Sequence, residues 1–181
     1  MKTKQMFVGL GAVAALGAAI VPMASYAADS SSSDVAVSLR VGSTISMALD
    51  SNTINEEVLS GGSSTSKTTV ATVSTNSATG YTIAATPTPA TGALTSTEGN
   101  TIAYVGTSYS TAAEGWALSV GGTYKDLDTN SGTSTEGTIP LFSSDSPASS
   151  VGTTINYNFK TDASTPSGDY TATLEYTAAV K

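Results

Sequence analysis

The sequence contains no cysteine and no histidine among its 181 residues. Without these residues the chain cannot form a disulfide, a Ser-His-Asp or Cys-His catalytic site, or a typical zinc site. A lipid anchor on an N-terminal cysteine is excluded for the same reason. The commonest hydrolase mechanisms are therefore ruled out, and the stability of the fold must come from packing.

Charged residues are also scarce, at 12% of the chain, and seven basic residues stand against fourteen acidic ones. The basic residues do not cluster, so nucleic acid is not an expected partner, because phosphate binding needs grouped lysines and arginines. An apolar period of 3.6 residues does not persist beyond the first 27 residues. The sequence therefore predicts no helix longer than a single turn.

The first 27 residues have the pattern of a secretory signal peptide. Lys2 and Lys4 precede an apolar run at 6–23, and small residues occupy the −3 and −1 positions of a cleavage site after Ala27. We expect residues 1–27 to be removed, leaving a net charge of −9 and no membrane contact. The alternative is an uncleaved anchor, because the apolar run is nearly long enough to span a bilayer. An exported chain without cysteine is typical of Gram-positive-type cells.

The mature chain divides into a serine-rich flexible spacer at 28–34 and one domain at 35–181. Apolar and polar residues alternate at 153–160 and again at 170–180, with the period of two that half-buried strands require. A turn containing Pro166 and Gly168 separates these runs, so we expect them to form a closing pair of strands. The sequence predicts an all-β fold, a single Ig-like or Greek-key antiparallel β-sandwich of about seven to nine strands.

Further strands are expected along the rest of the chain. Residues 35–49 alternate as one long strand, or as two with a bend at Gly42. A second hairpin is expected to join the run that starts at Thr68 to 81–85. Shorter strands are expected at 102–105, 116–120 and 139–142, and Pro140 restricts the last of these to an edge strand or to a non-strand segment.

Two runs resemble signatures of secreted, threonine-rich surface proteins of Gram-positive-type and candidate-phylum bacteria. They are TVATVSTNSATGYTI at 69–83 and TDASTPSGDYTATLEYTA at 161–178. The run GWALSV at 115–120 is similar to the Trp-x-Leu element of WxL cell-wall-binding domains. This resemblance implies non-covalent association with a cell-wall polymer through Trp116 and Leu118.

The aromatic residues allow a second interpretation from the pattern alone. A lone tryptophan on an alternating strand, such as Trp116, is more often a core anchor than an exposed binding platform. Four tyrosines follow the inward phase and are expected to be structural: Tyr81, Tyr157, Tyr170 and Tyr176. Three others flank loops and could line a binding face: Tyr104, Tyr109 and Tyr124.

One loop has the spacing of a calcium site. Asp126, Asp128 and Asn130 place oxygen donors at alternate positions, where they can converge on Ca²⁺. An EF-hand loop needs glycine at its sixth position and glutamate at its twelfth, and here those are Ser131 and Gly137. A plain turn rich in Asp, Asn and Gly has the same composition. We expect a turn with no tight calcium site, and no other cofactor.

The sequence favours a non-enzymatic, secreted cell-surface structural or adhesive module of a bacterium. Its expected partners are a cell-wall polymer, other surface proteins or further copies of itself. The alternative is a pilin-like subunit that assembles by β-strand addition, because 35–49 is a long alternating segment behind a flexible spacer.

Ser64 and Lys67 match the S-x-x-K spacing of some acyl-transfer enzymes without their companion motifs. A glycosidase using two carboxylates is the third hypothesis.

Overall fold

The computed structural model describes residues 36–58, 64–128 and 137–181, so the signal peptide, the spacer and Val35 lie outside the described residues. The chain separates into two units, 1–39 and 40–181. In the first unit, residues 36–39 are described, and they are exposed and belong to no strand or helix. In the described chain no helix combines the length and the hydrophobicity needed to cross a bilayer.

The described residues of the second unit form an all-β structure, as predicted, with one short 3-10 helix, η1 (Gly106–Ser110). Seven of the eleven strands of the described chain have five residues or more: β1 (Ile45–Leu49), β2 (Ser64–Thr75), β3 (Tyr81–Thr88), β6 (Gly115–Val120), β8 (Ile139–Ser144), β9 (Ala148–Lys160) and β11 (Thr173–Val180). Four are shorter: β4 (Leu94–Ser96), β5 (Thr101–Ile102), β7 (Thr123–Tyr124) and β10 (Tyr170–Thr171).

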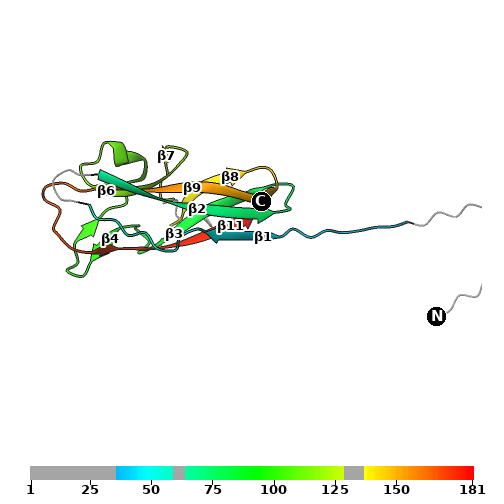
Figure 1. Ribbon diagram of the computed structural model, residues 1–181, viewed down its shortest axis with the longest axis horizontal. Coiled ribbons are helices and arrows are strands. Elements are labelled where there is room, and N and C mark those ends of the chain that lie inside the picture. Colours follow the sequence, from blue (N-terminus) through cyan, green and yellow to red (C-terminus); the bar gives the residue numbers. More distant parts are fainter. Residues whose placement is uncertain (1–35, 59–63, 129–136) are drawn as a thin grey trace, which may run out of the picture. The chain divides into compact units, whose positions relative to one another are not determined.

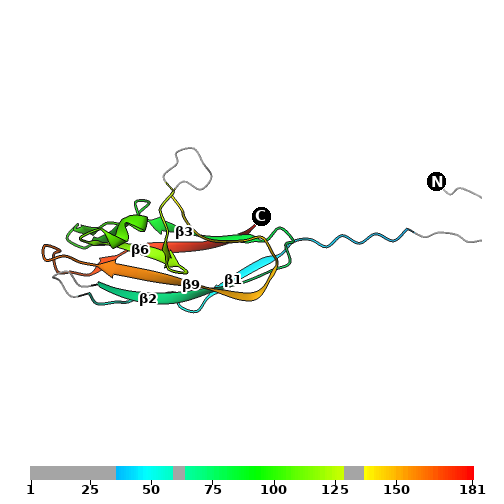
Figure 2. The same cartoon turned by 90° about the horizontal axis from the view of Figure 1, so that it is seen from above.

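The long strands form two layers (Figures 1 and 2). Sheet A has the order β1-β2-β9-β6-β7, and sheet B has the order β11-β3-β8. A small third sheet has the order β10-β4-β5. All named strands pair antiparallel. The order β1-β2-β9-β6 corresponds to strands A-B-E-D of an immunoglobulin-like sandwich, and the pair β3-β11 corresponds to strands C and F.

The core lies between the two sheets, where the apolar residues of alternating strands meet. β-branched and aromatic side chains suit such a pleated, half-buried surface. The largest fully buried apolar side chains come from both sheets: Trp116, Tyr81, Ile83, Leu118, Ile139, Leu141, Ile155 and Val73. Burial of each aliphatic side chain of this size stabilises the fold by about 1.5–3 kcal/mol relative to exposure.

Two expected hairpins are wrong. The runs at 153–160 and 170–180 are strands, but β9 pairs with β2 and β6 in sheet A, whereas β11 pairs with β3 in sheet B. In the same way β2 and β3 are consecutive strands that belong to different sheets. Their turns therefore carry the chain from one layer to the other. Alternation identifies the buried face of a strand but does not identify its neighbour.

The prediction of a long strand at 35–49 is also wrong for most of the described residues in that range. Only Ile45–Leu49 form a strand, and residues 36–44 pair with no other strand of the described chain. Val37, Leu39 and Val41 are 89%, 88% and 74% exposed. The alternation that predicted a strand is present, but no sheet of the described chain covers its apolar face.

Candidate functional site

Trp116 and Leu118, the residues expected from the WxL resemblance to contact a cell wall, lie in the core. Their exposed fractions are 2% and 0%. The indole N–H of Trp116 donates to the carbonyl of Gly92 at 2.8 Å. Phe159 stacks on the indole with 6.2 Å between ring centroids, and Tyr104 meets it edge-on at 4.9 Å. The arrangement is that of a core anchor, and it leaves no indole surface for a polymer.

The three tyrosines that could line a binding face all have structural contacts. The hydroxyl of Tyr104 donates to the carbonyl of Lys125 at 2.5 Å and accepts from the backbone N–H of Leu118 at 3.3 Å. Burial raises the pKa of Tyr104 to about 12. Tyr109 is buried, donates to the carbonyl of Phe159 at 2.9 Å and packs against Tyr124, with 5.0 Å between ring centroids.

The residues with calcium-site spacing make other contacts in the structure. The carboxylate of Asp126 accepts the backbone N–H of Thr107 at 2.7 Å and its hydroxyl at 2.9 Å, so it anchors the start of η1. The backbone of Asp128 pairs with Thr138 and Gly137. Asn130 lies outside the described residues. Over 36–58, 64–128 and 137–181 no three acidic side chains gather in a group that could hold a metal ion.

The S-x-x-K pair does not have the arrangement of a nucleophile and its base. Lys67 lies on β2 with its ammonium nitrogen 3.0 Å from the carboxylate of Glu56. Thr65 donates to the other oxygen of Glu56 at 2.9 Å. The hydrogen bond from Lys67 is the largest cause of a lowered pKa at Glu56. Ser64 and Lys67 lie three positions apart on β2, so their side chains point to opposite faces of the sheet and the lysine is not placed to act as the base of Ser64.

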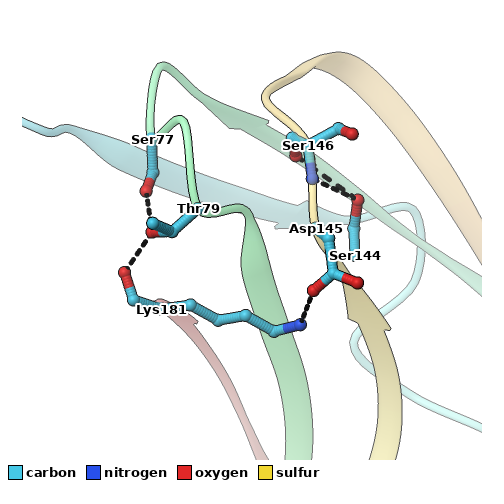
Figure 3. A network of polar contacts seen from close by, with 6 residues as sticks. All are labelled: Ser77, Thr79, Ser144, Asp145, Ser146 and Lys181. Carbon is cyan, nitrogen blue, oxygen red and sulfur yellow. Dashed lines mark hydrogen bonds and ion pairs between the residues drawn. The ribbon is translucent and has the colours of Figure 1, made fainter.

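Polar contacts fasten the end of β11 to two neighbouring turns (Figure 3). The ammonium of Lys181 lies 2.5 Å from the carboxylate of Asp145, and this contact lowers the pKa of that carboxyl. The hydroxyl of Thr79 donates to the backbone oxygen of Lys181 and exchanges a 3.0 Å hydrogen bond with Ser77. These groups are used in structural contacts.

Two border strands leave their inward apolar side chains only partly covered. β11 is the last strand of sheet B, and its inward side chains, Leu174, Tyr176 and Ala178, are only half-buried. We call these three residues the β11 edge. β1 lies alongside β11, at the border of the other sheet (Figure 1). Its inward residues are also only half-buried: Ile45, Met47 and Leu49. The alternation of apolar and polar residues predicted which side chains of both strands face inward. It did not predict that those side chains are only half-buried on this side of the sandwich.

Comparisons of this chain with models of protein families, with curated protein sequences and with solved structures gave no match. The resemblance to threonine-rich surface proteins and WxL domains therefore stays a prediction.

Proposed function

We propose that this chain is a non-enzymatic structural or adhesive module that a bacterium secretes and displays on its surface. The observation that carries the proposal is the use of its reactive groups in structural contacts. Lys67 pairs with Glu56, the carboxylate of Asp126 holds the start of η1, and Lys160 donates to the carbonyl of Ala112 at 2.5 Å. The leader pattern at 1–27 supports export.

The outer faces of the long strands support the same role. Threonine, serine and asparagine occupy the outward phase, with a low density of charge. Such a surface stays hydrated without strong attraction to nucleic acid or to anionic lipid. Antiparallel sandwiches with one hydrated face on each sheet are stable spacers, and they present loops at both ends for contact with other surface molecules.

Export and display can be tested on the producing cells. We expect the intact mass of exported protein to correspond to a chain that begins at Ala28, and protease added to whole cells to remove it. A leader variant with Lys2 and Lys4 changed to glutamate is the control, and it should remain inside the cell. A chain that keeps Met1 would indicate a membrane anchor instead. Purified protein that hydrolyses cell-wall polysaccharide, with loss of turnover on replacing one acidic residue, would overturn the non-enzymatic role.

A further inference from the structure

The longest strand at any sheet border in the described chain is β11, with eight residues. The other border strands are shorter, and β8 carries Pro140, which lacks the N–H needed for pairing. In an immunoglobulin-like sandwich the strand next to F is G. Here β11 has the position of F, and no strand of the described chain has the position of G. Exposed edges of this length readily accept an added strand.

The same chain contains a segment with the properties of an added strand. Val37, Leu39 and Val41 are exposed and alternate with Ala36, Ser38 and Arg40. Burying three aliphatic side chains of this kind strongly favours association, because each leaves water. The half-buried residues of the β11 edge and of β1 offer the apolar surface that such a strand would cover.

The positions of two charged residues favour one register of the added strand. Arg40 is the only arginine in the sequence, and Glu175 is the only charged residue of β11. Both are exposed on the polar phase of their segments. An antiparallel arrangement with Arg40 opposite Glu175 brings all three apolar residues of the segment into phase with the β11 edge. Val41 then faces Leu174, Leu39 faces Tyr176 and Val37 faces Ala178. A parallel arrangement with the same charge pair leaves Val37 opposite Ala172, before β11 begins.

The chain's own segment cannot reach the antiparallel register. Ile45, at the start of β1, lies at the same end of the sandwich as Val180, because Ile45 pairs with Thr75 and Val180 pairs with Tyr81 across one short connection. Leu174 lies about 20 Å from that end, six strand steps of roughly 3.3 Å. The four steps from Val41 to Ile45 span at most about 14 Å.

The connection to β1 is also held in place. The side-chain amide of Asn76 donates to the carbonyl of Gly42 at 2.9 Å, and its oxygen accepts the N–H of Thr44 at 2.7 Å. We propose that residues 36–41 of one copy add to β11 of a second copy as an antiparallel strand, with Arg40 opposite Glu175. The added strand occupies the G position of the acceptor sandwich. Because each copy has one donor segment and one acceptor edge, repeated addition gives a head-to-tail polymer.

This inference extends the proposed structural role, and purified protein tests it separately from display on cells. The chain has no cysteine, so each introduced cysteine is the only thiol. We would mix two exported, purified single variants, Ser38→Cys and Thr177→Cys, and oxidise them. These residues are exposed and face each other in the antiparallel register, so we expect a disulfide-linked heterodimer identified by mass spectrometry.

Thr173→Cys in place of Thr177→Cys is the matched control, because Ser38 would meet Thr173 only in the parallel register. We expect its cross-linking to be lower by roughly tenfold, since its α carbon is too distant in the antiparallel register. Preferential cross-linking to Thr173, or no cross-linking in either mixture, overturns the proposal. A double variant with Ser38→Cys and Thr177→Cys should give a ladder of covalent oligomers. A monomer with an internal disulfide would contradict the inference.

Sedimentation velocity on exported protein tests whether the apolar side chains of residues 36–41 drive self-association. Replacing Val37, Leu39 and Val41 by serine should weaken self-association by at least about a hundredfold, because three buried side chains are lost. The control changes only the polar phase, Ala36→Ser with Ser38→Ala, and should associate normally. Arg40→Glu should weaken association by roughly two- to fivefold, and Glu175→Arg in the partner copy should restore it. Equal association of the apolar variant and the control would overturn strand addition.

Discussion

The phenolic oxygens of Tyr157 on β9 and Tyr176 on β11 lie 2.5 Å apart, so a hydrogen bond joins the two sheets through the core. Burial raises the pKa of both hydroxyls, and it does so most at Tyr176. Sheet A and sheet B are held together mainly by apolar contacts, and this polar link fixes their relative register at one point. The pair also lies beside the open side of β11.

Removing one of these hydroxyls should cost more than removing both. Tyr157→Phe leaves the hydroxyl of Tyr176 without this partner, and we expect a loss of about 1–2 kcal/mol in the free energy of unfolding. The double variant with Tyr176→Phe should lose no more than the single one, because no unpaired polar group stays buried. Urea unfolding measures both. Tyr170→Phe, whose exposed hydroxyl donates to Pro166, is the control and should change stability by under about 0.5 kcal/mol. Additive losses would contradict this account.

Stability should fall at alkaline pH. The folded-state pKa values of Tyr104 and Tyr176 lie above the ordinary value of 10.0. A raised folded-state pKa contributes stability that is fully present below pH 10 and is lost as the pH rises, because the unfolded chain releases these protons first. Ultraviolet absorbance of tyrosinate should show Tyr104 ionising near pH 12 and Tyr176 ionising only on unfolding. Tyr176→Phe should make the decline less steep, and an unchanged decline would argue against burial as its cause.

Trp116 should behave as a core residue in fluorescence and in stability. Because it is the only tryptophan, its emission reports one site, and we expect a blue-shifted signal that iodide quenches poorly. Trp116→Ala should cost about 3–5 kcal/mol. Trp116→Phe should cost less, because the ring stacking on Phe159 can persist while the hydrogen bond to Gly92 is lost. A red-shifted and freely quenched signal would restore the exposed-platform interpretation.

The close approach of Gly80 to Ser144 should make a side chain at position 80 intolerable. A Cβ there would lie 2.0 Å from the carbonyl oxygen of Ser144, and the backbone φ is +86°. Gly121 is the matched control, since its φ is +57° and nothing lies within 4 Å of its Cβ position. We expect Gly121→Ala to cost about 1–2 kcal/mol from backbone strain alone, and Gly80→Ala to cost several kcal/mol more. Similar thermal midpoints for the two variants would show that the contact is not restrictive.

The sequence predicted the parts of the fold that depend on local pattern. Alternation placed Tyr81, Ile155 and Tyr157 inside, and all three are buried. The rule that proline avoids central strands predicted an edge strand or a non-strand segment at Pro140, and β8 lies at the border of sheet B. These expectations succeed because the face of a strand is set by residues two positions apart, and the identity of the partner strand is not needed.

Long-range relationships could not be predicted in this way. Leu174 has the pattern of a buried residue but is half-buried, because the strand that would cover it is missing from the described sheet. Asp126 was expected in a loop with metal-binding spacing, and its carboxylate instead meets Thr107, 19 residues earlier in the chain. Both outcomes depend on which segments meet in space, which no local period encodes.

The shared end of β1 and β11 has a mechanical consequence. Ile45 begins β1 and Val180 ends β11 beside the same connection between β2 and β3. Tension applied between these two strand ends would pull β1 away from β2 and β11 away from β3. It would therefore break the hydrogen-bonded pairs of these strands one at a time. A strand added antiparallel along β11 would instead be loaded along its length, so that all its hydrogen bonds share the force. The domain should therefore peel easily when pulled by its own two ends, and a string of linked copies should resist stretching.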